Sequence, residues 1–266
     1  MAQATLSPAL AAYDPVLLDL DGCVWLGDEP TPRAVEAVTA LRAARKGVAF
    51  VTNDGRHGEE DVVRKLWRLG FRAAREEVVT VGSAVHRVCA SAPWRSAIVI
   101  GAPPLHRHVA EAGLRILNGT DLAAAADVVV AAAHDGFDYG ELRQATQALL
   151  RGAALIAAGL DATFPMPDGP WPATGTVVAA LEYATGVRAR NVGKPAAELF
   201  RTALERLGPG RALVVGDRLD ADIGGARAAG VDGAVVLTGA TSAAQAAAAD
   251  PRPAHVAATL GDLVLA

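Results

Sequence analysis

The chain has 266 residues, of which 52% are hydrophobic and 20% are charged, a composition that excludes an intrinsically disordered protein. Its formal net charge is -4 and it contains no dense block of Lys and Arg, so we expect neither nucleic acid nor an anionic membrane as a partner. A chain of this length forms one large domain or a domain that carries an inserted one. The expected substrate is therefore a small molecule.

The N-terminus and the cysteines indicate the cellular compartment. Residues 1–6 lack the basic segment of a signal peptide, and no apolar stretch reaches the roughly 18 residues that cross a bilayer. Cys23 and Cys89 are the only cysteines and show no metal-binding spacing. We therefore expect a cytoplasmic protein with no disulfide framework and no structural zinc.

Short apolar runs recur between turn residues, as expected for strands that are buried on both faces of a parallel sheet. The predicted strands are Val16–Asp19, Val48–Thr52, Ala97–Ile100, Val128–Ala132, Ala153–Ala157, Ala212–Val215 and Ala234–Leu237. Helices are predicted between them, for example over 58–69 and over 31–46, with Thr31 as N-cap and Pro32 at the first helical position. This alternation predicts parallel βαβ units and an α/β fold.

Residues 82–187 have their own series of strands and helices, without a carboxylate cluster at the strand ends. We interpret them as an inserted α/β domain, and residues 1–81 and 188–266 as the domain that carries it. Within the insertion, residues 159–172 are rich in Pro and Gly and are predicted to form a loop, since proline cannot continue a helix or a central strand. Loops of this length are often functional.

Three of the predicted strands lead into polar residues at their carboxyl ends. These residues are Asp19, Thr52 and Asp217. In an open parallel sheet, they project at the edge where ligands of doubly wound folds bind. The sequence therefore predicts one site that is assembled from three distant segments.

The motif Asp19-Leu-Asp21-Gly places two carboxylates two positions apart at the end of a strand. One carboxylate can attack phosphorus while its neighbour protonates the leaving oxygen and then deprotonates water. Asp217 and Asp222 would complete a site of hard oxygen ligands that suits Mg²⁺. Alone, Asp-x-Asp-Gly is more typical of an ordinary turn, and the acids at 217–222 also fit a solvated acidic turn.

Thr52, Asn53, Asp54 and Lys194 are the candidates for binding the phosphate of a substrate. A hydroxyl and an amide after the second strand can donate hydrogen bonds to phosphate oxygens. Lys194 is one of only three lysines among 25 basic residues, and its ammonium can neutralise a phosphoryl group. The alternatives are a plain Thr-Asn turn and an exposed structural lysine.

Taken in chain order, these motifs resemble the haloacid dehalogenase superfamily, specifically its subfamily IIA of NagD-like, 4-nitrophenylphosphatase-like and phosphoglycolate phosphatase-like proteins. The motifs are Asp19-Leu-Asp21-Gly, Thr52-Asn53, Lys194-Pro195 and Gly216-Asp217-Arg-Leu-Asp-Ala-Asp222. Residues 127–130, 159–161 and 175–182 also look like the cap of this family and its return to the core. The resemblance covers nearly the whole chain.

The resemblance implies a Rossmann-like core with a large α/β cap domain of C2 type, inserted between the second and third motifs. It implies that Asp19 is the nucleophile that forms an aspartyl-phosphate and that Asp21 is the general acid and base. A homodimer through the cap is also implied.

The resemblance further implies a ligand set for Mg²⁺ and for the phosphoryl group. The metal would be held by the carboxylates of Asp19 and Asp217 and the main-chain carbonyl of Asp21, with Asp222 as a supporting acid. Thr52 and Lys194 would hold the phosphoryl oxygens.

The second motif departs from the family pattern. After Thr-Asn the family continues with another Asn and then Ser-Ser-Arg, whereas this chain continues Asp54-Gly55-Arg56-His57. A carboxylate at Asp54, in the predicted phosphate-binding loop, is unfavourable unless Arg56 pairs with it. The departure therefore bears on substrate affinity.

Substrate specificity is expected from the cap, because the core contacts little beyond the phosphate. The candidates are His134, Asp161, Phe164 and Trp171. The alternative is that Phe164 and Trp171 only pack the loop and that His134 is a polar residue at a strand end.

The leading hypothesis is a Mg²⁺-dependent phosphatase for a small phosphate monoester such as phosphoglycolate, glycerol phosphate or a sugar phosphate. A phospho-acceptor signalling domain also uses clustered Asp with Thr and Lys, but such domains are shorter and need no cap. An inactive phosphate-binding regulatory protein and phosphoryl transfer to an acceptor other than water are further alternatives. The core motifs do not distinguish among substrates, because specificity is expected to vary with the cap loops.

Overall fold

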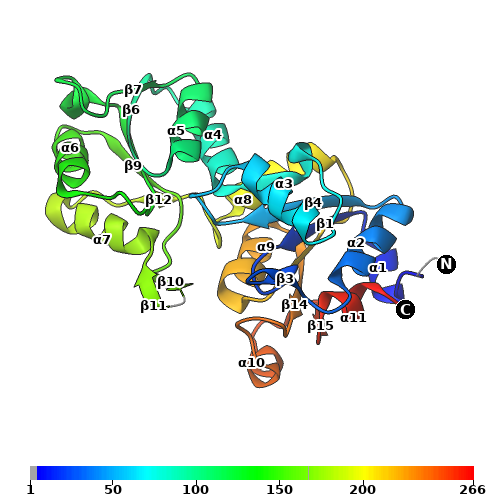
Figure 1. The fold of residues 1–266 in the computed structure, drawn as a ribbon. Coiled ribbons are helices and arrows are strands. Elements are labelled where there is room, and N and C mark those ends of the chain that lie inside the picture. Colours follow the sequence, from blue (N-terminus) through cyan, green and yellow to red (C-terminus); the bar gives the residue numbers. More distant parts are fainter. Residues whose placement is uncertain (1–4, 167) are drawn as a thin grey trace. The chain divides into compact units, whose positions relative to one another are not determined.

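The computed structural model describes residues 5–166 and 168–266, which divide into two compact units (Figure 1). The first unit extends to Thr52 and continues over Glu59–Val79 and Lys194–Ala266. The second unit consists of Asn53–Gly58 and Thr80–Gly193. Both units have a parallel sheet, so the predicted α/β fold is confirmed. None of the helices in the described residues has the length and apolar character needed to span a membrane.

The first unit contains a six-stranded sheet with the order β15-β14-β13-β1-β4-β5, and the pairings from β15 to β4 are parallel. Its strands are β1 (Pro15–Asp19), β4 (Gly47–Thr52), β5 (Val78–Thr80), β13 (Leu213–Gly216), β14 (Asp232–Val236) and β15 (His255–Ala257). The apolar runs form strands here because helices cover both faces and every residue of β1 and β13 is buried. The carboxyl ends of β13, β1 and β4 are therefore neighbours.

Helices cover both faces of this sheet. Alternate strand residues such as Val16 and Leu18 share a core with α1 (Pro8–Ala11), α2 (Ala34–Ala43), α3 (Glu59–Arg68) and α11 (Leu260–Val264). Two further helices pack on the sheet, with α8 (Ala197–Leu207) against β1 and β4 and α9 (Gly224–Ala229) against β14. The remaining elements are β2 (Trp25–Leu26), β3 (Glu29–Pro30), η1 (Arg75–Glu77), η3 (Leu219–Ile223) and α10 (Ala243–Ala248).

The predicted start of α2 is wrong by two residues. The helix begins at Ala34, and Arg33 before it has a left-handed backbone with φ of 58°. Thr31 does not cap the helix, because its hydroxyl donates to the main-chain oxygen of Cys23 at 2.6 Å. This tertiary contact takes the hydroxyl away from the capping role that the Thr-Pro pattern favours.

The second unit contains a five-stranded parallel sheet with the order β12-β9-β8-β6-β7. Its strands are β6 (Ser96–Ile100), β7 (Arg115–Ile116), β8 (Val128–Ala131), β9 (Ala154–Ala157) and β12 (Arg190–Asn191). One face packs on α4 (Val81–Ser91) and α5 (Pro103–Glu111), and the other packs on α6 (Tyr139–Leu150), α7 (Thr174–Thr185) and η2 (Ala123–Ala125) (Figure 1). Because β12 pairs with β9, the unit extends beyond residue 187, the end of the insertion that the sequence indicates.

The segment predicted to be a loop contains a two-stranded antiparallel hairpin of β10 (Thr163–Met166) and β11 (Gly169–Pro172). The prediction was wrong because prolines are tolerated in strands whose outer edges are unpaired, where their missing N–H costs no hydrogen bond. Phe164 lies opposite Trp171 across the hairpin. Pro167, which belongs to the predicted loop, lies outside the described residues.

Candidate active site

The site begins with the order of three strands. Asp19 is the last residue of β1, Thr52 is the last residue of β4, and Asp217 follows β13. Because β1 pairs with both neighbours in parallel, these three side chains come from the same edge of the sheet, and all three are buried. The predicted convergence of three distant segments is therefore observed.

Three carboxylates form a cluster at this edge. One oxygen each of Asp19, Asp217 and Asp222 lies within 4.8 Å of the others. Asp222 comes from η3, a π-helical turn after β13, and its Oδ2 accepts a hydrogen bond from the main-chain N–H of Arg218 at 3.0 Å. Irregular turns of this kind occur frequently at functional sites. The turn aims the Asp222 carboxylate back at the sheet edge.

Lys194 is buried in the same cluster. Its Nζ donates to Asp19, to Oδ1 of Asp222 at 2.7 Å and to the main-chain oxygen of Val51 at 3.4 Å. Burial alone would lower the pKa of Lys194, but the charges of Asp19 and Asp222 outweigh burial and raise it. Lys194 is therefore protonated, and its charge lies against the carboxylate predicted to be the nucleophile.

The cluster carries more negative charge than Lys194 can balance. Burial, and next the neighbouring charge of Asp222, raise the pKa of Asp19 well above its usual range. Burial is also the main cause of the raised pKa of Asp217, with Asp222 adding to it. When all three carboxylates are ionised, Lys194 balances one of their charges, and a divalent cation would neutralise the other two. The oxygen donors fit Mg²⁺ in charge and in chemistry.

Two loops contact Asp217, one at Ala240 and one at Gly22, and the sequence motifs include only the second. Its Oδ2 accepts a hydrogen bond from the main-chain N–H of Ala240 at 2.6 Å. Gly22 has a φ of +83°, and a Cβ on it would lie 2.5 Å from Cγ of Asp217. A glycine is required here by both the backbone and the contact. The Gly after Asp21 and the Gly239 that follows β14 were the available sequence signals.

Asp21 differs from the other acids because its side chain is exposed. Its Oδ1 accepts a hydrogen bond from Nε1 of the buried Trp25 at 2.7 Å. An exposed carboxylate held in one orientation is suited to exchanging protons with a bound substrate and with water. The sequence did not reveal the role of Trp25, because a tryptophan four positions after Asp21 forms no recognisable pattern with it.

Comparison with known proteins identifies the family. The sequence profile described as haloacid dehalogenase-like hydrolase matches residues 16–115, and a second profile, described as HAD-hydrolase-like, matches residues 191–263. The chain belongs to the haloacid dehalogenase-like hydrolase family. The resemblance noted from the sequence motifs is thereby confirmed.

Relatives of this haloacid dehalogenase-like hydrolase include named phosphatases. It is 39% identical to D-glycerol 3-phosphate phosphatase of Mycobacterium tuberculosis over 248 residues. This alignment covers 92% of this chain and 69% of the relative. A structure of the glycerol phosphate phosphatase of that organism in complex with magnesium matches with a TM-score of 0.89 and 36% identity over 97% of this chain and 78% of the other. The structure of the 4-nitrophenylphosphatase of Thermotoga maritima matches with a TM-score of 0.88 and 29% identity. The match covers 97% of this chain and 98% of the other.

Two residues predicted to bind phosphate belong to the second unit of this haloacid dehalogenase-like hydrolase. Asn53 lies beside Gly193. A Cβ atom added to Gly193 would lie 2.9 Å from Oδ1 of Asn53. Asp54 accepts a hydrogen bond from Nδ1 of His57 at 2.6 Å and from the main-chain N–H of Arg56 at 2.8 Å. Burial would raise the pKa of Asp54, but these bonds outweigh it and lower the pKa.

From the sequence, Asp54 is expected to be unfavourable unless Arg56 pairs with it. The two residues do pair, because Nε of Arg56 lies 3.6 Å from Oδ1 of Asp54. The guanidinium of Arg56 also lies 4.3 Å from the ring centroid of Phe164. The charge of Asp54 is thus balanced within its own loop.

The predicted specificity residues lie in three places in the second unit. Phe164 and Trp171 are paired across the hairpin, with ring centroids 6.3 Å apart. His134 follows β8, and its Nε2 is bonded to Oε2 of Glu141 at 2.9 Å, a contact that supports the start of α6. The main-chain oxygen of Asp161 accepts a hydrogen bond from Gly175 at 2.9 Å. Their roles in specificity stay predictions.

Proposed function

We propose that this chain is a Mg²⁺-dependent phosphatase that hydrolyses a small phosphate monoester through an aspartyl-phosphate intermediate. The observation that carries the proposal is the buried cluster of Asp19, Lys194, Asp217 and Asp222 at the carboxyl edge of the sheet. The named phosphatases among the relatives support the same class of reaction.

In the first proposed step, a carboxylate oxygen of Asp19 attacks the phosphorus. The new bond joins that oxygen to phosphorus while the bond from phosphorus to the ester oxygen breaks. Asp21, held by Trp25, gives a proton to the leaving oxygen, so that an alcohol departs. Lys194 orients Asp19 and stabilises the negative charge that the phosphoryl oxygens carry.

In the second proposed step, water attacks the phosphorus of the aspartyl-phosphate. Asp21, now ionised, takes a proton from this water, the bond between phosphorus and Asp19 breaks, and inorganic phosphate leaves. The exposure of Asp21 suits this exchange, because the residue must reach first the leaving group and then water. Thr52, at the end of β4, would hold a phosphoryl oxygen.

The carboxylates of Asp19 and Asp217 would hold Mg²⁺ with the main-chain carbonyl of Asp21, and Asp222 would support them. When bound, the ion supplies positive charge that offsets the charge of the phosphoryl group. Burial, with the charge of Asp222 added to it, raises the pKa values of Asp19 and Asp217, and the positive charge of a bound cation would oppose this effect.

Glycerol 3-phosphate is the substrate to test first, because a relative at 39% identity is named for it. The second unit is proposed to act as the cap, with Phe164 and Trp171 of the hairpin as its candidate contacts. Phosphoglycolate and sugar phosphates complete the test panel. Selectivity for one of these three classes would identify the substrate.

The test is phosphate release by wild type and by Asp19→Asn with and without Mg²⁺. We expect wild type to require Mg²⁺ and Asp19→Asn to lose activity by on the order of 10⁴-fold or more. Asp220→Asn is the control, because Asp220 lies close in sequence to Asp217 and Asp222 but is exposed and paired with Arg218. The control should keep its activity within about twofold.

Two outcomes would overturn the proposal. Mg²⁺-dependent turnover by a correctly folded Asp19→Asn variant would exclude Asp19 as the nucleophile. Stoichiometric phosphorylation of the wild type without turnover would indicate a phospho-acceptor protein instead.

A further inference from the structure

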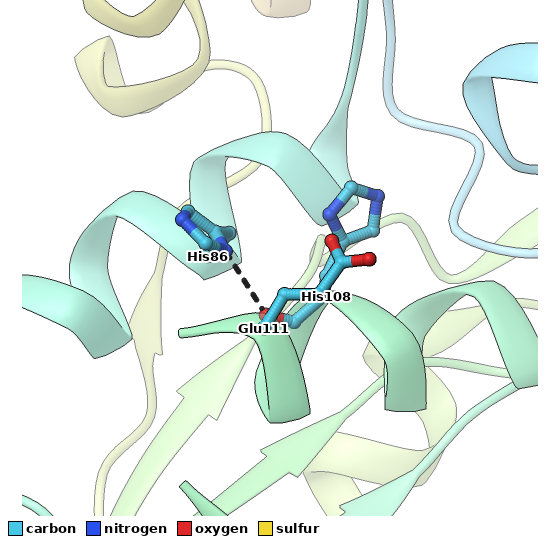
Figure 2. Close-up of side chains that lie close together, drawn as sticks. All are labelled: His86, His108 and Glu111. Carbon is cyan, nitrogen blue, oxygen red and sulfur yellow. Dashed lines mark hydrogen bonds between the residues drawn. The ribbon is translucent and has the colours of Figure 1, made fainter. Parts of the chain in front are cut away.

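A group of three side chains that can bind a metal lies in the second unit, whereas the carboxylates around Asp19 belong to the first. It consists of His86 from α4 and of His108 and Glu111 from α5. One ligand atom from each residue lies within 4.8 Å of the others. Figure 2 shows the three side chains drawn together between the two helices.

The positions of the three residues follow from helix geometry. His108 and Glu111 are three positions apart on α5, so their side chains share one face of that helix. His86 approaches from α4, and its Nδ1 lies 3.2 Å from the main-chain oxygen of His108 (Figure 2). This contact holds the His86 ring against α5.

The two helices are fixed against one another by their packing. Residues of α4 and α5, among them Val85 and Val109, share one apolar core. His108 is buried, and a Cβ on Gly82 of α4 would lie 2.3 Å from Cδ2 of the His108 ring. Gly82 therefore provides the space that His108 occupies. Ligands on packed helices are held more accurately than ligands on loops.

The donor set differs in chemistry from the cluster around Asp19. Two imidazoles and one carboxylate are typical of sites for zinc and other late transition metals, whereas Mg²⁺ prefers oxygen ligands alone. We propose that His86, His108 and Glu111 bind a zinc ion that links α4 to α5. The expectation of no structural zinc rested on the cysteines, and this group contains none.

To bind zinc, the three ligand atoms must move closer together than the 4.8 Å within which they now lie. Zinc bonds of about 2.0–2.2 Å in a tetrahedral site bring pairs of ligand atoms to roughly 3.4 Å from one another. The side chains that can move are those of the exposed Glu111 and the partly buried His86, whereas His108 is held by its packing. Three protein ligands leave the fourth position to water.

The experiment is a calorimetric titration of Zn²⁺ into chelator-treated protein in excess Mg²⁺, which is present to occupy the oxygen site. We expect wild type to bind one Zn²⁺ per chain, and His86→Ala and Glu111→Gln each to weaken binding by about tenfold or more. His106→Ala is the matched control, since His106 lies on α5 but outside the group, and it should bind as wild type does. Asp19→Asn should also bind as wild type does.

A second measurement tests whether bound Zn²⁺ stabilises the fold. Zn²⁺ should raise the melting temperature of wild type and of His106→Ala but not that of Glu111→Gln. Glu111 is exposed, so its replacement by Gln leaves the fold intact, and circular dichroism checks this. The proposal is overturned by the absence of saturable Zn²⁺ binding in wild type. It is equally overturned by binding that His86→Ala and Glu111→Gln leave unchanged. Neither result depends on catalytic activity.

Discussion

The two units have the same architecture but differ in the residues that follow their strands. Each has a parallel sheet with helices on both faces. In the first unit, three adjacent strands lead to Asp19, Thr52 and Asp217, whereas β6, β8 and β9 of the second unit lead to Gly or Ala. Within the part of the second unit that the structure describes, no Asp, Glu, Lys or Arg is buried. The residues at the strand ends, rather than the fold, therefore determine where chemistry is placed.

The electrostatics of carboxylates differ in the same way. In the cluster of the first unit, burial and neighbouring charge raise the pKa of Asp19 and of Asp217. In the second unit, hydrogen bonds from the backbone lower the pKa of Asp127 and of Glu182. The carboxylates of the first unit carry negative charge that a cation could neutralise, whereas those of Asp127 and Glu182 are already stabilised by hydrogen bonds. Mutations in the two units should therefore have different consequences.

The largest difference is expected from removing a cation in each unit. Lys194→Met leaves buried carboxylates without their partner and should lower the free energy of unfolding by about 3–5 kcal/mol in the absence of Mg²⁺. Arg188→Met in the second unit removes an exposed partner of Glu182 and should cost roughly 0.5 kcal/mol or less. Urea denaturation with a chelator measures both. Similar losses in the two variants would refute the contrast.

A comparison of two glycines with positive φ should sharpen the contrast. Gly113→Ala in the second unit adds a Cβ in open space, so only backbone strain of about 1–2 kcal/mol is expected. Gly22→Ala adds the same strain and also displaces Asp217, so its activity should fall by about 10²-fold. Thermal unfolding and phosphate release are the measurements. Full activity in Gly22→Ala would show that the Asp217 contact is not needed.

Asp127 allows a test by pH in the second unit. Its Oδ2 accepts hydrogen bonds of 2.9 Å from the N–H groups of Arg95 and Ser96, and these lower its pKa. Its contribution to stability is therefore present above the unfolded value of about 3.9 and is lost as pH falls through the lower folded value. Asp127→Asn should cost about 0.5–1 kcal/mol at pH 7, because the group is largely exposed.

The measurement for Asp127 is urea denaturation of wild type and Asp127→Asn from pH 7 downwards. The difference between the two should shrink as pH drops below about 4. Asp121→Asn, which alters an exposed aspartate of the same unit, should match wild type throughout. A difference between wild type and Asp127→Asn that stays constant with pH would contradict the assigned cause.

A small effect is expected for the pair of Arg56 and Phe164. A double-mutant cycle of Arg56→Met and Phe164→Leu should give a coupling of about 0.5–1 kcal/mol from the cation–π contact. A control cycle of Arg56→Met and Tyr183→Leu should give none, since Tyr183 is 96% exposed. Urea denaturation of the variants supplies the energies. An absence of coupling in the first cycle would show that the contact between Arg56 of the second motif and Phe164 of the hairpin contributes no stability.

Much of the fold could be predicted because strands buried on both faces are almost wholly apolar. Each predicted strand, from Val16–Asp19 to Ala234–Leu237, corresponds to an observed one within about two residues at either end. Predictions failed where local signals were overridden. The hairpin of β10 and β11 was hidden by its prolines, and the start of α2 was misplaced because Thr31 bonds to Cys23.

The sequence by itself determined which chemistry-bearing residues lie at the strand ends, because an apolar run followed by Asp or Thr can be recognised locally. Only the tertiary structure decided that Lys194 is buried and donates directly to Asp19 and Asp222, since these residues lie far apart in the chain. The supports from Trp25, Gly22 and the Ala240 main chain also depend on segments that meet only on folding. A main-chain donor such as the N–H of Ala240 is present in every residue but proline, so its role could not be predicted from the sequence.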